Sequence, residues 1–332
     1  MRVHKNTAYI LSEGAHIETR GENLRVVAKS GTRELPLRNL ESVVFLVWDG
    51  WISAEAARRC SEMKVGVAFA TPHGRFLTGL TGAPKGNITL RMAQFSFAQD
   101  KAKKLSLAKK IVAAKLRAQR KQLGRHRRDH KEQTDEAERH VKRLETLAEK
   151  AECEEELLGV EGEGAREYFG HFPILLKNPI RPWEGRSRRP PRSPENALLS
   201  FLYAIATNDC RSALLIVGLD PYLGIYHHEC SGKPALALDL VEEFRTPLAD
   251  QTLMALSNRS ELKESDFEEN ELGWELNEAG RKKCLTTYQE RKKEEIEHPW
   301  VQGKVPWGLI PVIQARRLAR HFREEEPYET FA

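Results

Sequence analysis

The sequence predicts an α+β protein: a small N-terminal β-sheet domain, residues 1–92, followed by a larger all-α C-terminal domain, residues 93–332, that carries a candidate metal site. The length of 332 residues fits about two domains of roughly 150 residues each. The first ninety-odd residues hold short apolar or alternating segments between Gly, Asn and Ser turns, as strands do. After Phe95 the apolar period lengthens from two residues to about 3.6, which is the period of an α-helix.

The N-terminal domain is predicted to hold a small sheet and one helix. Ser53 is placed to cap this helix, which carries Ala56, Ala57, Cys60 and Met63 and is expected to pack on the sheet. A turn at residues 72–74 joins the last two strands. The expected strands share short apolar runs bounded by turn residues: 8–11, 15–19, 24–28, 33–36, 43–47, 65–70 and 75–80.

A long basic helix is expected to open the C-terminal domain. Residues 101–131 hold thirteen Lys or Arg and one acid, Asp129. A solvated helix face usually alternates its charges in sign, and this segment does not, which favours a surface that binds a polyanion with salt-sensitive affinity. The apolar stripe beneath the charges repeats at helical spacing, at Leu105, Ala108, Val112, Leu116 and Leu123.

The rest of the C-terminal domain is predicted from its prolines and charges. Residues 178–194 contain five prolines and five arginines, which exclude regular helix and predict a mobile basic loop. Residues 195–206 read as a buried helix. The charged stretch 262–298 and the arginines that follow it predict further surface helices.

Several protein classes are disfavoured by composition. With 40% hydrophobic and 30% charged residues the chain is typical of a soluble globular protein. Its apolar runs fall far short of the roughly 18 residues of a membrane span, and residues 1–11 lack the apolar core of a signal peptide, so we expect a cytoplasmic protein without a membrane partner. Five scattered cysteines without a CxxC pair predict reduced thiols.

Residues 218–245 form a candidate divalent-metal site. Asp239 lies in an apolar run, where a carboxylate loses hydration unless a cation or a hydrogen-bond donor compensates. If residues 235–244 are helical, Glu242 and Glu243 are both spaced to share its face. Two adjacent histidines, His227 and His228, offer an imidazole. One imidazole and two or three carboxylates suit Mg²⁺ or Mn²⁺, but spacing does not choose among these residues.

Several motifs give the chain a family resemblance. In order they are NLESVVFL, TPHGRFL, GVEGEGAREYF, RRPPRSPENALLSFLYAI, GLDPYLGIYH, KPALALDLVEEFR and QARRLARHF. Together they resemble the CRISPR-associated protein one family, the integrase and endonuclease of spacer acquisition. They span nearly the whole chain and occur in the family's order, so coincidence is a poor explanation.

The resemblance implies a particular set of site residues. The family's metal-binding glutamate lies in EGxxAR and maps to Glu161, which by itself resembles a surface charge among other glutamates. The histidine that closes GLDPxLGxxH maps to His227, and the carboxylates of DLxEEFR map to Asp239 and Glu242. By this resemblance Glu161, His227 and Glu242 would hold Mg²⁺ or Mn²⁺. Asp239 would be a further ligand or would orient one.

The resemblance also implies an activity and its partners. The expected activity is that of a metal-dependent DNA endonuclease and integrase, which inserts foreign DNA fragments as new spacers into a CRISPR array through 3′-hydroxyl attack on a phosphodiester. The expected partners are double-stranded DNA (prespacer and CRISPR repeat), a second copy bound through the N-terminal domain, and CRISPR-associated protein two. A non-catalytic DNA-binding scaffold of the adaptation complex is the alternative. The expected phosphate contacts are Arg125, Arg127, Arg128, Arg186, Arg188 and Arg189.

Overall fold

The N-terminal part contains two four-stranded sheets and one helix. The computed structural model describes residues 6–80, 88–125 and 131–331. One sheet has the order β1-β5-β7-β8, with β8 antiparallel to β7 and the other pairs parallel, and the second has the order β4-β3-β2-β6. The elements are β1 (Asn6–Ile10), β2 (Ala15–Arg20), β3 (Asn23–Ala28), β4 (Gly31–Pro36), β5 (Leu40–Leu46), β6 (Gly50–Ile52), α1 (Ala54–Glu62), β7 (Gly66–Ala70) and β8 (Phe76–Leu80).

The predicted cap of α1 is confirmed, and its predicted apolar face is confirmed in part, because Ala56 and Cys60 are buried whereas Met63 is exposed. Ser53 accepts a hydrogen bond from the backbone N–H of Ala56 at 3.2 Å, which satisfies one of the free amides at the start of α1. Ala56 and Cys60 are the buried residues of α1. They join an apolar core formed from both sheets, in which Ile17 and Phe45 are fully buried.

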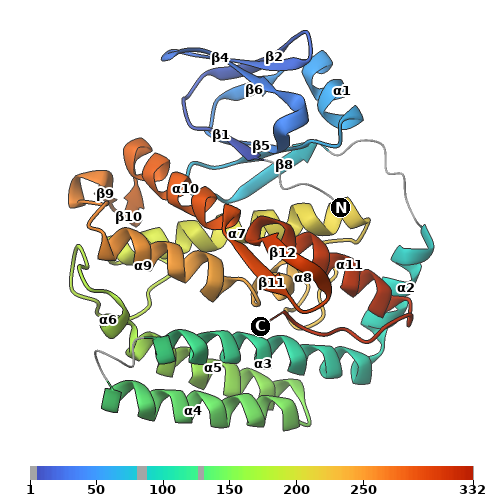
Figure 1. The fold of residues 1–332 in the computed structure, drawn as a ribbon, viewed down its shortest axis with the longest axis vertical. Helices are drawn as coiled ribbons and strands as arrows, with labels where there is room; N and C mark the ends of the chain where they lie inside the picture. The colour runs from blue at the N-terminus through green and yellow to red at the C-terminus, as the bar shows by residue number, and fades with distance from the viewer. Residues whose placement is uncertain (1–5, 81–87, 126–130, 332) are drawn as a thin grey trace.

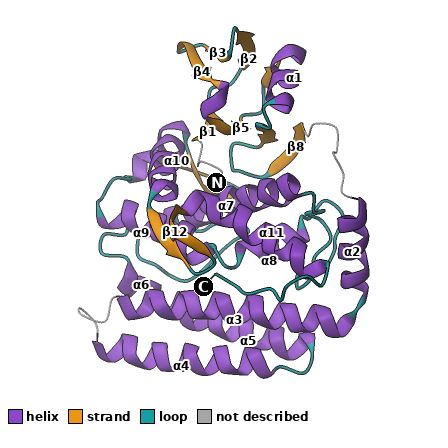
Figure 2. Cartoon of the chain, turned by 45° about the vertical axis from the view of Figure 1, so that its right-hand side comes forward, coloured by secondary structure: helices purple, strands orange, loops and turns teal. Residues whose placement is uncertain are grey.

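The C-terminal part is mostly helical (Figure 1). Its long helix α7 crosses the middle of this part, and α3, α4 and α5 lie together at the end farthest from the sheets (Figures 1 and 2). The helices are α2 (Ile88–Gln99), α3 (Lys101–Arg125), α4 (Lys131–Lys150), α5 (Glu154–Gly170), α6 (Phe172–Leu175), α7 (Pro194–Val217), α8 (Ala235–Val241), α9 (Gln251–Asn258), α10 (Glu278–Lys293) and α11 (Ile310–Phe322). No helix in the described ranges is long and apolar enough to cross a bilayer.

The prediction of an all-α C-terminal domain is wrong in two places. Two hairpins occur, β9 (Phe267–Asn270) with β10 (Gly273–Leu276), and β11 (Glu295–His298) with β12 (Val301–Pro306). In the first hairpin, Phe267, Trp274 and Leu276 are buried. The prediction failed because glutamates crowd these short strands and hide their apolar alternation, so the stretch resembled a surface helix.

The basic helix α3 differs from its predicted role. Much of its positive charge is paired inside the protein, because α4 supplies acids that lie later in the sequence. Arg117 donates to Glu145 at 2.6 Å and Arg120 donates to the same carboxylate at 3.2 Å. Lys110 donates to the carbonyl of Tyr328 at 2.7 Å. The helix is therefore not one continuous basic face. Arg125 is exposed at its end, and the predicted contacts Arg127 and Arg128 lie outside the described residues.

The arginine- and proline-rich segment 178–194 contains no helix before Pro194, as predicted. It is nevertheless anchored at several points. Glu195 accepts hydrogen bonds from the backbone N–H groups of Ile180 at 2.6 Å and Arg181 at 3.0 Å. Arg186 donates to the side chains of Asn196 at 2.9 Å and Ser200 at 3.1 Å. Arg186 is thus used to hold the segment on α7, whereas Arg188 and Arg189 are exposed.

Candidate active site

Asp239, the carboxylate within the apolar run, is fully buried and accepts four hydrogen bonds. Its Oδ2 accepts from the backbone N–H groups of Ile225 at 2.6 Å and Tyr226 at 3.2 Å. Its Oδ1 accepts from the backbone N–H and the ring Nδ1 of His227, both at 2.8 Å. Because a carboxylate only accepts, Nδ1 carries the proton and Nε2 of a neutral ring keeps a lone pair for a ligand. Asp239 therefore orients His227 from behind.

The loop before α8 fits over Asp239 because Gly224 has no side chain. A Cβ on Gly224 would lie 2.5 Å from the carbonyl oxygen of His227 and 2.6 Å from Cβ of Ala235, closer than real contacts allow. The loop is also tied to the start of α8, since the carbonyl of Pro221 accepts from the backbone N–H of Leu236 at 3.0 Å. These contacts place the His227 ring above the end of α8.

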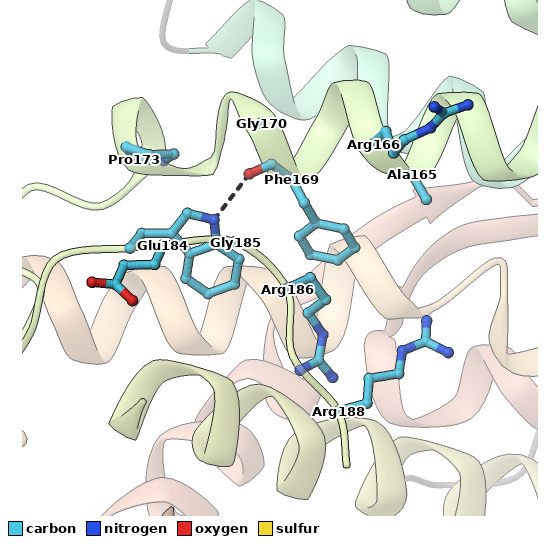
Figure 3. Close-up of a pocket in the computed structure, with 10 residues that line it drawn as sticks. Ala165, Arg166, Phe169, Gly170, Pro173, Glu184, Gly185, Arg186 and Arg188 are labelled. Carbon is cyan, nitrogen blue, oxygen red and sulfur yellow. Dashed lines mark hydrogen bonds between the residues drawn. The ribbon is translucent and has the colours of Figure 1, made fainter. Parts of the chain in front are cut away.

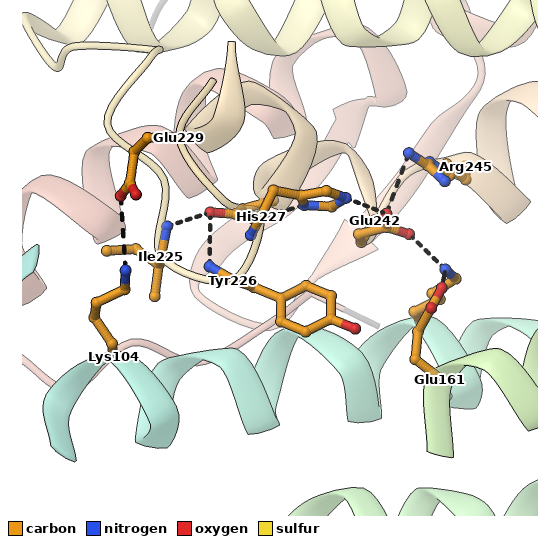
Figure 4. A network of polar contacts seen from close by, with 10 residues as sticks. Lys104, Glu161, Ile225, Tyr226, His227, Glu229, Glu242 and Arg245 are labelled. Carbon is orange, nitrogen blue, oxygen red and sulfur yellow. Dashed lines mark hydrogen bonds and ion pairs between the residues drawn. The ribbon is translucent and has the colours of Figure 1, made fainter. Parts of the chain in front are cut away.

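Glu161, His227, Glu242 and Arg245 lie close together (Figure 4), and Lys115 joins them through ion pairs, so that four parts of the chain meet here. Lys115, from the middle of α3, pairs with Glu161 on α5, and its Nζ lies 3.1 Å from Oε2 of Glu242 at the end of α8. On the other side of Glu242, Oε1 lies 3.2 Å from Nη2 of Arg245 and 3.7 Å from Nε2 of His227. The Glu242 carboxylate thus stands between two cations and the imidazole.

Close helix packing brings Glu161 to this position. Gly164, one turn after Glu161 on α5, lies against Leu116 of α3, and a Cβ at Gly164 would overlap the Leu116 side chain. Leu116 directly follows Lys115, so this glycine contact lets α5 approach α3 at the level of the Lys115–Glu161 pair. Gly164 occupies one of the two variable positions of the EGxxAR motif, whereas a Cβ on the motif's own Gly162 would meet nothing within 4 Å.

The electrostatics favour an ionised Glu242. The side chain is 2% exposed, and burial alone would favour the neutral acid. The positive charges of Arg245 and Lys115 outweigh burial and lower the pKa of Glu242 to about 2. Glu242 is therefore a permanent anion at neutral pH, as a ligand for a hard cation must be.

The donor set fits a divalent metal ion. Glu161 and Glu242 turn oxygens toward one shared cation, the Lys115 ammonium, and His227 turns Nε2 toward Glu242 while Nδ1 contacts Asp239. Two carboxylates and one imidazole leave positions open for water or substrate, which suits Mg²⁺ or Mn²⁺. Among the described residues, no three His, Cys, Asp or Glu side chains are already arranged to hold a metal ion.

The structure shows which histidine of His227 and His228, and which glutamate of Glu242 and Glu243, faces the centre. Glu243 points away from the centre, accepting hydrogen bonds from the hydroxyl of Tyr328, from Gln314 at 3.0 Å and from the backbone N–H of Phe331 at 2.7 Å. Burial raises the pKa of Glu243 to about 7. His228 is exposed on the surface loop. Glu243 is a core residue, and His227 and Glu242 are the members of each pair that face the centre.

Three residues of the centre are not predicted from the sequence. Lys115 was grouped with the basic face of α3, although its place beside Leu116 in the apolar stripe could have marked it as inward-facing. Arg245 closes the DLVEEFR motif and pairs with Glu242. Tyr226 brings a buried hydroxyl that has no hydrogen-bond partner in the described part of the chain. Nothing in the sequence distinguishes this tyrosine from a core residue.

The chain can now be compared with known proteins. A family model described as CRISPR associated protein Cas1 matches residues 8–290. The chain belongs to the Cas1 family. Among curated Cas1 proteins, the "CRISPR-associated endonuclease Cas1 1" of Chlorobaculum tepidum is 38% identical over an alignment of 335 positions, and this alignment covers 97% of this chain and 96% of the relative. The family resemblance of the sequence motifs is confirmed.

Solved structures show the same Cas1 fold. A casposase bound to integration product has a TM-score of 0.84 and 20% identity, covering 98% of this chain and 93% of that chain. One chain of a Cas6-RT-Cas1–Cas2 complex has a TM-score of 0.81 and 23% identity, in a match that covers 99% of this chain and 36% of that chain. TM1797, a CAS1 protein from Thermotoga maritima, has a TM-score of 0.81 and 21% identity, covering 98% of this chain and 99% of that chain, so the mixed α+β architecture is that of a Cas1 structure.

Proposed function

We propose that this Cas1 protein is a divalent-metal-dependent DNA endonuclease and integrase that inserts foreign DNA fragments as new spacers into a CRISPR array. The observation that supports this best is the meeting of Glu161, His227 and Glu242 around one cation position, with Asp239 behind the imidazole. The proposal also rests on membership of a family whose curated relatives are CRISPR-associated endonucleases.

Each residue has a distinct part in the proposed reaction. Glu161, His227 and Glu242 would hold Mg²⁺ or Mn²⁺, which when bound neutralises charge on the attacked phosphate and lowers the pKa of the attacking 3′-hydroxyl or water. Asp239 fixes the His227 ring so that Nε2 faces the centre. Arg245 holds Glu242 in place and keeps it ionised.

DNA would approach the centre over a pocket of about 570 Å³ beside it (Figure 3). Phe169 and Trp183 form part of its lining, and Arg166 and Arg188 stand at its rim. Within the described residues, neither of these two guanidiniums pairs with a carboxylate, so both are available to phosphates. Arg166 follows Glu161 by five residues on α5, or roughly 8 Å along the helix.

The pocket adjoins the centre through a shared tyrosine. The guanidinium carbon of Arg186, on the pocket wall, lies 5.7 Å from the ring centroid of Tyr203, and that of Arg245 lies 5.0 Å from the same centroid. In the proposed arrangement a strand whose phosphates contact Arg166 and Arg188 would run from this pocket toward Arg245 and its partner Glu242. Of the predicted phosphate contacts in this segment, we retain Arg188 and Arg189 and assign Arg186 to holding the segment.

The expected protein partners are a second copy of the chain and the Cas2 protein. Support for Cas2 comes from the similar Cas1 in a solved complex that contains Cas2. Support for a dimer through the N-terminal domain comes from apolar side chains exposed there. Trp48 is 67% exposed, and Leu77 and Leu80 are exposed on β8, an edge strand of its sheet. Exposed apolar groups beside an open edge are typical of a surface that binds another protein.

An integration assay tests the proposed function. Purified protein, with and without Cas2, is mixed with a labelled duplex carrying free 3′-hydroxyls, a supercoiled array plasmid, and Mg²⁺ or Mn²⁺. We expect joined product that requires the metal, disappears with a blocked 3′ end, and is lost in Glu161→Gln, His227→Ala and Glu242→Gln. A non-catalytic scaffold predicts instead that the three variants support spacer acquisition in cells as well as the wild type does.

A further inference from the structure

We propose that Lys115 is a built-in competitor of the metal ion: its ammonium holds the cation position between Glu161 and Glu242 in the metal-free protein, and has to leave when a divalent ion binds. This inference rests on the proposed function, because it takes Glu161 and Glu242 to be metal ligands. It assigns to a lysine of α3 control over how tightly the centre binds metal.

The position of Lys115 is the first support. Its side chain is 7% exposed, and its neighbours Ala114 and Leu116 are buried. A lysine buried to this extent needs anionic partners. Among the described residues, its ion-pair partners are Glu161 and Glu242, the same carboxylates that would bind the metal. An ammonium offers three N–H donors and no lone pair, so Lys115 can replace the ion but cannot bind it.

The charge balance of the centre is the second support. Glu161 and Glu242 face Lys115 and Arg245, while Asp239 is satisfied by backbone amides and the His227 ring. The two glutamates are thus already neutralised. A divalent ion added to this balanced, largely buried set would be opposed by like charge unless one of the two resident cations moved away.

Of the two cations, Lys115 is the one able to move. The guanidinium of Arg245 is held on two sides, by Oε1 of Glu242 and by the ring of Tyr203. Tyr203 is itself fixed by a 2.8 Å hydrogen bond to the buried Asp250. Lys115 carries its charge at the end of a flexible four-carbon stem. The absence of a ready metal-binding trio in the described residues agrees with carboxylates that are turned toward an ammonium.

Mn²⁺ binding to the full-length protein tests the proposal. Free Mn²⁺ is followed by electron paramagnetic resonance in wild type, Lys115→Met, Lys115→Arg and Lys110→Met. Lys110 is the matched control, because it lies on the same helix and pairs with the C-terminal segment outside the centre. We expect Lys115→Met to bind Mn²⁺ at least tenfold more tightly than wild type, and Lys115→Arg and Lys110→Met to stay within about twofold of it.

Thermal unfolding supplies a second readout. Without metal, Lys115→Met should melt at a lower temperature than wild type, because the partly exposed Glu161 and the buried Glu242 both lose their shared ammonium, and saturating Mn²⁺ should restore more stability to it than to wild type. Should Lys115→Met fail to fold, Lys115→Gln takes its place. Unchanged or weaker Mn²⁺ affinity in the folded variant would overturn the role of Lys115. If the Glu242→Gln variant bound Mn²⁺ as tightly as wild type does, this result would overturn the metal site itself, and with it the proposed function.

Discussion

Replacement of Asp239 by Asn tests how His227 is oriented, because it leaves the proposed ligands Glu161, His227 and Glu242 unchanged. The aspartate has two acceptor oxygens for four donors. Asparagine keeps one oxygen and presents an NH₂ group where the other was. Each oxygen of Asp239 accepts from two donors, so whichever oxygen the NH₂ group replaces, two donors lose their acceptor. Each unsatisfied buried donor costs about 1–3 kcal/mol, so one or two such donors predict a loss of about 1–6 kcal/mol in the free energy of unfolding.

The same substitution should weaken metal binding. If the NH₂ group of the introduced asparagine faces Nδ1, the proton of His227 moves to Nε2, and Nε2 can no longer act as a ligand. Loss of such a supporting hydrogen bond typically weakens metal affinity about 10- to 100-fold. The two quantities are measured by urea unfolding and by Mn²⁺ titration of the same protein.

Glu243→Gln is the control for that measurement. Glu243 is an equally buried carboxylate from the same motif, but its partners are Tyr328, Gln314 and Phe331, away from the centre. We expect Glu243→Gln to keep wild-type Mn²⁺ affinity. A folded Asp239→Asn protein that bound Mn²⁺ as tightly as wild type would refute the assignment of Asp239 as the residue that orients His227.

Three further predictions concern pH, packing and DNA. Burial raises the pKa of Glu243 in the folded state from 4.5 to about 7. Its contribution to stability is therefore complete below pH 4.5 and is lost as the pH rises to about 7. Stability measured across that range should therefore fall less steeply in Glu243→Gln. Gly224→Ala should cost about 1–3 kcal/mol in urea unfolding, because its Cβ meets backbone, and an unchanged midpoint would contradict the close approach of the loop to α8. Arg166→Ala and Arg188→Ala should each weaken DNA binding and reduce the salt slope by about one without lowering the melting temperature. Arg186→Ala should instead lower the melting temperature, and equal behaviour of all three arginine variants would argue against a division of roles between them.

Local signals predicted much of the fold and part of the centre. The cap of α1 at Ser53 is a contact between neighbours in sequence, so sequence reveals it. The need of Asp239 for compensating donors could also be read from its apolar surroundings. The choice of Glu242 over Glu243 could not, because both lie within one turn and only distant residues distinguish them. Tyr328 and Phe331 draw Glu243 into the core from the C-terminal end of the chain.

Long-range pairing explains the main errors as well. The sequence does not reveal that the charges of α3 are paired, because their partners, such as Glu145, lie on another helix. The position of Lys115 beside the apolar stripe indicates that it faces inward, but its partners Glu161 and Glu242 are known only from the packing of α5 and α8 on α3. The β9–β10 hairpin was missed because Phe267 and Trp274 are few among many glutamates. For α3 and Lys115 the deciding contacts join residues that are far apart in sequence, whereas the hairpin is a local pairing hidden by its charged composition.

The centre is assembled from three helices that are distant along the chain, with Lys115 on α3, Glu161 on α5 and Glu242 at the end of α8. A shortened chain, or one in which α3 has separated from α5, keeps the same carboxylates but no longer holds them around a common cation. Any cleavage of DNA at this centre therefore requires the completed fold, in which α3, α5 and the end of α8 are packed together.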